Sequence, residues 1–293
     1  RILETYGGVF ISDVVGLGKT YICAMLAKIF LVKGKKLIIC PPVLVDYWQE
    51  VMRDFDVAAR VESLGRLDKI LTGKSDYEYV FIDEAHRFRN AFTEGYTKLH
   101  EICYGKKVIL ISATPINNYS SDIENQIYLF QPRHMSSIPG VRNLEAFFKR
   151  LNDGAKNLEG SERLTQLNEN SKQIRSRILR HIMIRRPRSE IAKYYHDDMT
   201  RQGLTFPEIG EPEKIIYSFN DEINAIFNET LKVIKDFTYS RYKPFIYLKD
   251  TSPFSSLLIS QNNMGGFMKS LLVKRLESSF YAFRQTLERF IAS

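Results

Sequence analysis

Short apolar runs alternate with helical patterns over the first 133 residues of the chain. The apolar runs predict five strands, over residues 7–12, 36–40, 59–64, 79–83 and 107–112. Several of them are continuous and do not alternate, which is typical of strands that are covered on both faces. Between the first two, residues 19–32 have the helical period, with Ile22, Met25, Leu26 and Ile29 on one face. This order predicts an α/β fold with a doubly wound parallel sheet.

Longer helical patterns follow residue 133. One strand-like segment, residues 213–219, interrupts them, and a helix is expected to begin at Asn220 or Asp221. A last helix is predicted over about 264–291, with one apolar face made of Phe267, Leu271, Phe280, Phe283, Leu287 and Phe290. At ~150 residues per domain the length favours two domains. We predict one over residues 1–133 and a mainly helical one over 134–293.

Positive charge is concentrated in the second of these parts. The net charge of +8 divides into +1 for residues 1–133 and +7 for residues 134–293. A basic surface attracts polyanions, so nucleic acid is the first partner to consider, and a solubilising surface is the alternative. Three cysteines in apolar contexts indicate core thiols in a reducing compartment, hence a cytoplasmic location. No apolar run has the ~20 residues that cross a bilayer, so no membrane partner is expected.

The stretch ISDVVGLGKT, residues 11–20, has the features of a phosphate-binding loop. It follows a predicted strand and precedes a predicted helix, where backbone N–H groups and the helix dipole favour an anion. Gly16, Leu17 and Gly18 would let the backbone approach a phosphate. Lys19 would reach the β and γ phosphates, and the Thr20 hydroxyl would ligate Mg²⁺. A glycine-rich turn that happens to contain Lys-Thr is the alternative.

Two further strands are followed by polar residues at their carboxyl ends, which is where an open parallel sheet binds its ligands. Asp83 and Glu84 end the fourth run; Asp83 can hold Mg²⁺ and Glu84 can polarise an attacking water. After the fifth run, the hydroxyls of Ser112 and Thr114 can bond to the neighbouring acidic tip and couple nucleotide state to another surface. For Trp48, which follows the second run, core packing is favoured over a base contact.

These motifs, in this order, resemble those of helicase superfamily 2, most closely its Swi/Snf-like branch of DNA translocases with the bacterial RapA-type members. The family loop reads D-E-x-G-L-G-K-T, which Asp13 matches and from which Val14 departs. The stretch DEAHRFRN, residues 83–90, is similar to the family's D-E-A-H-R-x-x-N. By contrast, SATP at residues 112–115 is closer to general helicases than to remodellers.

The resemblance implies a RecA-like P-loop motor lobe over 1–133, with ATP and Mg²⁺ as cofactors and duplex DNA as partner. It implies a coupling role for His86 and a DNA-contacting one for Pro42, in CPPVLVDYW. The stretch LRHIMIRRPRSEI, residues 179–191, is similar to an arginine-rich family segment, in which Arg185 and Arg186 contact either DNA or acids of the motor lobe.

Residues 134–293 would then be a helical linker that leads to a second RecA-like lobe in a longer protein, since the chain begins at Arg1 and the family's arginine finger is not recognisable. The predicted enzyme is an ATPase that moves on DNA and that is weak without the second lobe. The alternatives are a strand-separating helicase or restriction-type defence motor, and a catalytically silent, nucleotide-gated DNA-binding module. The oligomeric state is left open.

Overall fold

The computed structural model describes residues 1–29, 34–72, 76–115, 120–207, 210–214, 216, 218–238 and 255–292. The chain forms two compact units, Arg1–Glu208 and Ile209–Ser293. Each unit has a hydrophobic core of its own.

A parallel sheet of six strands is the centre of the first unit. Its order is β3-β2-β4-β5-β1-β6, and every strand pairs in parallel with its neighbours. The strands are β1 (Gly8–Ile11), β2 (Lys35–Cys40), β3 (Ala59–Ser63), β4 (Tyr77–Asp83), β5 (Lys107–Ile111) and β6 (Met183–Ile184). All five predicted strands are confirmed, with ends that differ by one or two residues. The short edge strand β6 was not predicted.

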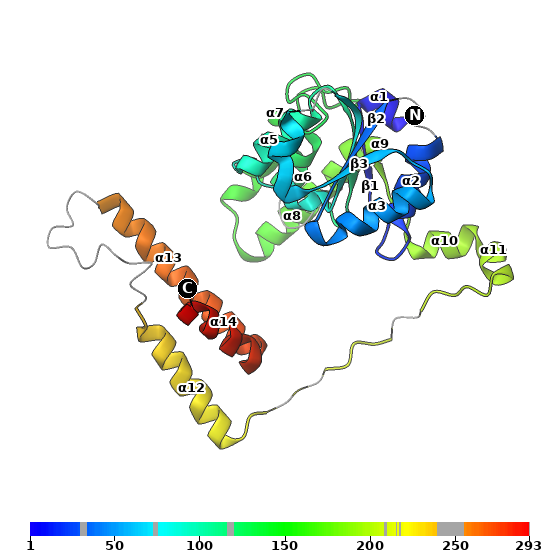
Figure 1. The fold of residues 1–293 in the computed structure, drawn as a ribbon. Coiled ribbons are helices and arrows are strands. Elements are labelled where there is room, and N and C mark those ends of the chain that lie inside the picture. The colour runs from blue at the N-terminus through cyan, green and yellow to red at the C-terminus, as the bar shows by residue number, and fades with distance from the viewer. Residues whose placement is uncertain are drawn as a thin grey trace. The chain divides into compact units, whose positions relative to one another are not determined.

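Helices cover both faces of this sheet, as Figure 1 shows, which confirms the doubly wound α/β fold. Alternate residues of each strand enter different cores: Phe10 and Leu110 face one, and Ile11 and Ile109 face the other. The helices on the second face are α1 (Ile2–Tyr6), α2 (Lys19–Ile29) and α3 (Val45–Asp54). The first face is covered by α4 (Leu67–Leu71), α5 (Glu94–Cys103), α6 (Ser120–Ile127), α7 (Leu144–Lys156), α8 (Gly160–Ile174), the π-helix Arg175–Leu179 and α9 (Arg180–Ile182).

The first compact unit extends well beyond residue 133, where the sequence analysis placed the domain boundary. Phe148 of α7 and Ile182 of α9 are fully buried in the same core as Val108 and Leu110 of β5. Strand β6 then adds to β1, so that the segment after residue 133 completes the sheet. The unit closes with α10 (Arg188–Tyr194) and α11 (His196–Arg201).

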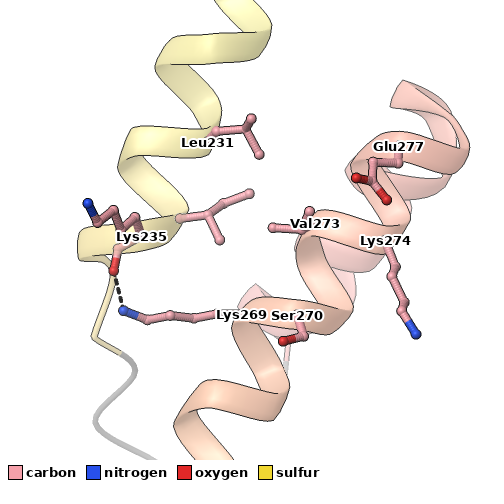
Figure 2. A pocket seen from close by; sticks show the side chains of 8 residues that line it. Leu231, Lys235, Lys269, Ser270, Val273, Lys274 and Glu277 are labelled. Atoms are coloured by element: carbon pink, nitrogen blue, oxygen red, sulfur yellow. Dashed lines mark hydrogen bonds between the residues drawn. The ribbon is translucent and has the colours of Figure 1, made fainter. Parts of the chain in front are cut away.

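Three helices make up the described part of the second unit: α12 (Asp221–Asp236), α13 (Ser255–Ser278) and α14 (Phe280–Ala292). The start of α12 was predicted correctly, because the Asn220 side chain accepts a hydrogen bond from the Ile223 N–H and caps the helix. Figure 2 shows α12 and α13 facing each other, with Leu231 and Val273 directed toward one another. Lys269 of α13 donates to the carbonyl of Lys235 at the end of α12.

Two predictions for this second unit are wrong. The expected helix over 264–291 is two helices, α13 and α14, which meet at Ser279. Among the side chains of α13 that the structure describes, Leu272 and Leu276 are buried, whereas Phe267 is exposed. The strand expected over 213–219 is not formed at residues 213, 214, 216, 218 and 219; residues 215 and 217 lie outside the described residues.

The structure of the described residues contains no helix that is both long and apolar enough to cross a membrane. The three cysteines, Cys23, Cys40 and Cys103, are buried free thiols, as the sequence predicted. Burial raises the pKa of the Cys40 thiol to about 12, and the nearby Asp83 carboxylate acts in the same direction. These thiols therefore serve as small apolar side chains of the core.

Candidate functional site

The polar residues that end three neighbouring strands meet at the carboxyl edge of the sheet. Strands β4 and β1 flank β5, with Asp83 paired to Ile111 and Ile111 paired to Ile11. The loop after β1, the acids after β4 and Ser112 after β5 therefore lie side by side. This is the edge at which open parallel sheets bind ligands.

The glycine-rich loop after β1 has an unusual backbone. Gly16 and Gly18 have φ values of 86° and 68°, a left-handed conformation that disfavours side chains. Helix α2 begins at Lys19, directly after the loop, so its first N–H groups have no partner within the helix. The Lys19 ammonium donates to the carbonyl oxygens of Asp13 at 3.0 Å and Val14 at 3.5 Å. A cation and free helix N–H groups thus converge on one loop.

This set of donors fits a magnesium–nucleoside triphosphate. Backbone N–H groups at a helix start and a lysine ammonium are ligands for phosphate oxygens. The Thr20 hydroxyl and the Asp83 carboxylate are oxygen donors of the kind that Mg²⁺ prefers. Among the described residues, no group of three or more His, Cys, Asp or Glu side chains is placed to hold a metal ion.

Asp83 and Glu84 differ sharply in environment. Asp83 is buried, and its two carboxylate oxygens accept hydrogen bonds from the Glu84 N–H and from the indole N–H of Trp48, both at 2.9 Å. Glu84 is half exposed and has a φ of 51°, which is strained for a residue with a side chain. Asp83 is therefore held in one orientation, and Glu84 projects from a strained turn of the kind that often marks a functional site.

The predicted coupling residues lie in one hydrogen-bonded group. His86, in the 3₁₀ turn Ala85–Phe88, has its Nδ1 3.1 Å from the Ser112 hydroxyl and 3.0 Å from a Glu84 carboxylate oxygen. The Thr114 N–H in turn donates to the Ser112 hydroxyl at 3.3 Å. The sequence analysis expected Ser112 to bond directly to the acidic tip, whereas the structure places His86 between Ser112 and Glu84.

Helix α3 contacts both groups that are predicted to hold Mg²⁺. The fully buried Trp48 orients Asp83, as described above. At the residue before Trp48, the pKa of Tyr47 is raised by a hydrogen bond with Tyr21, and a hydrogen bond with Thr20 opposes this shift. The sequence analysis predicted the burial of Trp48 but missed its hydrogen bond to Asp83. The one signal for this bond was the indole N–H itself, which usually needs a partner when tryptophan is buried.

The residues that were considered for nucleic-acid contact have different surroundings. Pro42 begins an exposed 3₁₀ turn, Pro42–Leu44, and Arg185 is exposed. Arg186, by contrast, is directed at the fully buried Asp13, whose carboxylate accepts from its guanidinium and from its backbone N–H. Arg186 therefore makes one of the two contacts expected for the arginine-rich segment, the pairing with an acid. Its contact with DNA stays a prediction.

Comparisons with known proteins give a family and several relatives. Residues 49–218 match the SNF2-related domain, a range that includes Asp83 and Glu84 and excludes the phosphate loop. The chain is 30% identical over 160 residues to "Uncharacterized ATP-dependent helicase YqhH" of Bacillus subtilis. This match covers 47% of this chain and 28% of that protein. It is 24% identical over 274 residues to "Probable ATP-dependent DNA helicase CHR23" of Arabidopsis thaliana, covering 78% of this chain and 25% of that protein.

Among solved structures, the chain is similar to the Sulfolobus solfataricus SWI2/SNF2 ATPase core in complex with dsDNA. The TM-score is 0.46 at 19% identity, over 90% of this chain and 54% of that one. The chain therefore spans about a quarter of the length of the curated relatives and about half of this structure. Because the family model matches more than half of its residues, the chain belongs to the SNF2-related domain family.

Proposed function

We propose that this chain is the ATP-binding lobe of an ATP-dependent translocase that moves on double-stranded DNA. The proposal rests on one observation: the glycine-rich loop after β1, with Lys19 at its end, meets Asp83 and Glu84 at the carboxyl edge of the sheet. A related protein is named an ATP-dependent helicase and another an ATP-dependent DNA helicase, which supports ATP and DNA as ligands. A cytoplasmic location accords with three free thiols.

Each residue of the site has a proposed role. The loop from Gly16 to Gly18 and the start of α2 hold the phosphates, and Lys19 leaves its two carbonyl partners to contact them. Thr20 and Asp83 would hold Mg²⁺, and the metal would neutralise phosphate charge. Glu84 orients and polarises the attacking water, and His86 and Ser112 relay the state of the site to the DNA-binding surface, which includes Pro42 and Arg185.

A second RecA-like lobe of the same full-length protein is part of the proposal. It would supply an arginine to the transition state, which in comparable enzymes is worth a factor of about 10³ to 10⁵ in kcat. This chain by itself is therefore expected to bind ATP and to hydrolyse it poorly.

The first experiment measures Mg²⁺-dependent binding of a fluorescent ATP analogue to this chain. Lys19→Ala is expected to weaken binding by roughly tenfold to a hundredfold, because it removes a charged hydrogen-bond donor to phosphate. Lys28→Ala is the matched control, since Lys28 is an exposed lysine in the last turn of the same helix. Equal affinity of the Lys19→Ala variant and the native chain would reject the phosphate loop.

The second experiment measures ATP hydrolysis by the full-length protein with duplex DNA, with single-stranded DNA and without DNA. Stimulation by duplex is expected. If duplex has no effect, the translocase proposal fails. If ATP binds but is not hydrolysed under any of the three conditions, the protein is instead a nucleotide-gated binding module.

A further inference from the structure

We propose that Arg186 is a positioning residue for the phosphate loop and acts on it through the carboxylate of Asp13. The inference rests on the proposed function, because it assigns a role to the loop that binds ATP. It makes the arginine-rich segment after α9 a structural component of the nucleotide site.

Residues 183–188, which we call the strap, run beside the loop as well as beside β1. The Ser12 N–H donates to the Ile184 carbonyl at 2.8 Å, and the Val14 N–H reaches the Arg186 carbonyl at 3.5 Å. Farther along, the Arg188 guanidinium donates to the Val15 carbonyl at 3.2 Å. The strap therefore contacts every residue of the loop from 12 to 15, the part that precedes Gly16.

The strongest of these contacts joins Arg186 to Asp13. Asp13 is fully buried, and its Oδ1 accepts from the Arg186 backbone N–H at 2.9 Å. The Arg186 Nε lies 3.2 Å from Oδ1 and 3.1 Å from Oδ2, and Nη2 also donates to Oδ2. The hydrogen bonds with Asp13 raise the pKa of Arg186. A buried carboxylate is costly unless it is paired in this way, so removal of Arg186 leaves Asp13 with an uncompensated charge.

Asp13 connects this ion pair to Lys19, the proposed phosphate ligand. Its side chain binds Arg186, while its backbone carbonyl accepts from the Lys19 ammonium at 3.0 Å. Gly16 and Gly18 follow in a left-handed conformation that disfavours side chains. If Asp13 leaves its buried position to hydrate an unpaired charge, the carbonyl and the loop after it must move too. Phosphate groups beyond the first are then expected to lose their binding geometry.

The test is a double-mutant cycle in which binding of ATP and of AMP is measured. Arg186→Gln is expected to weaken ATP binding about tenfold or more in the native background, and by less than about threefold in an Asp13→Asn background, because the charge it leaves unpaired is then absent. AMP affinity is expected to change less than about threefold in every variant, since AMP lacks the phosphates that the loop holds. Arg177→Ala is the matched control, as Arg177 is exposed in the π-helix Arg175–Leu179.

Thermal unfolding and a conservative variant keep the test decisive. The double variant D13N/R186Q is expected to unfold at a higher temperature than R186Q, because an unpaired buried charge is removed. Arg186→Lys keeps the charge without the two-pronged contact and is expected to bind ATP with intermediate affinity. It replaces R186Q in the cycle if R186Q does not fold.

Three outcomes would overturn the proposal. Unchanged ATP affinity in R186Q means that the pair has no role in positioning the loop. An equal loss in both backgrounds means that Arg186 contacts the nucleotide directly. Equal losses for ATP and AMP mean general destabilisation. Failure of the native chain to bind ATP is a different result, which rejects the proposed function and the inference with it.

Discussion

Trp48 connects core packing to the chemistry of the site. Its side chain is fully buried, and its indole N–H donates to Asp83, the proposed Mg²⁺ ligand, at 2.9 Å. A buried tryptophan N–H generally requires a partner, and here the partner is a carboxylate that also needs orientation. One hydrogen bond thus satisfies a buried donor and fixes the direction of Asp83.

Trp48→Phe is predicted to weaken Mg²⁺-dependent nucleotide binding by roughly tenfold, since a hydrogen bond to a charged group contributes about 1.5–3 kcal/mol. Phenylalanine retains most of the aromatic packing, so the chain is expected to remain folded. Binding is measured by titration of a fluorescent ATP analogue at several Mg²⁺ concentrations. Affinity in EDTA is the internal control and is expected to stay unchanged; an equal loss with and without Mg²⁺ would contradict the role given to Asp83.

The sequence reveals site residues when they are close together along the chain. Gly16, Gly18, Lys19 and Thr20 form one short pattern, and Asp83 with Glu84 ends an apolar run, so both groups could be proposed from the sequence. The Asp13–Arg186 pair spans 173 positions. Local spacing holds no information about such a contact, because it arises when β6 adds to the edge of the sheet beside β1. The sequence alone could therefore not identify Asp13 as the partner of Arg186.

Helix α2 illustrates why the face of a helix is harder to predict than its presence. The sequence pattern favoured an apolar face with Met25, but Met25 is 48% exposed. Among the side chains that the structure describes, Cys23, Ala24 and Ala27 are buried against the sheet, and the predicted Leu26 packs against the same core while only partly buried. Small side chains let a helix lie close to the sheet, so the buried face has few large apolar residues to mark it.

The break between α13 and α14 has a local cause that the apolar pattern concealed. The Ser279 hydroxyl accepts from the Ala282 N–H at 3.4 Å and so caps the start of α14. Serine favours such positions because its hydroxyl bonds to nearby backbone groups. An apolar residue every three or four positions on both sides of it predicted one continuous helix, although Ser279 ends it.

Helix α7 provides a test of whether the segment after residue 133 belongs to the core of the sheet. Phe148 is fully buried in the cluster that includes Val108 and Leu110. Phe148→Ala is predicted to lower the free energy of unfolding by about 3–5 kcal/mol, as measured by urea denaturation. Lys149→Ala, at the exposed neighbouring position, is expected to change it by less than about 0.5 kcal/mol. If α7 folded separately, unfolding of the sheet would be unaffected by Phe148→Ala.

At the scale of the whole molecule, net charge and hydrophobic pattern change near residue 133, but neither marks the end of the compact unit. The first compact unit ends at Glu208. The helices after residue 133 are amphipathic, and a pattern of that kind does not specify which surface they cover. Within the first unit, α7, α8 and α9 cover the sheet on the face opposite α2 and α3. The functional assignment of the two parts remains a prediction.

The boundary can be tested with two shortened chains, residues 1–133 and residues 1–207. The shorter chain loses ten buried side chains of the sheet's own core: Ile138, Val141, Leu144, Phe147, Phe148, Leu151, Ile174, Ile178, Leu179 and Ile182. At about 1.5–3 kcal/mol for each buried side chain, their loss approaches or exceeds the ~5–15 kcal/mol by which a typical domain is stable.

We therefore predict that residues 1–133 show no cooperative thermal transition, because the lost core contacts exceed the stability that remains. Strand β6 and Arg186 are missing from this fragment as well, so Asp13 is left unpaired and ATP binding is expected to be absent. Residues 1–207 keep the whole core and the strap, and are expected to unfold cooperatively and to bind ATP with the affinity of the full chain. Cooperative unfolding and ATP binding by residues 1–133 would show that the motor lobe ends where the sequence pattern changes, and that the later helices only cover it.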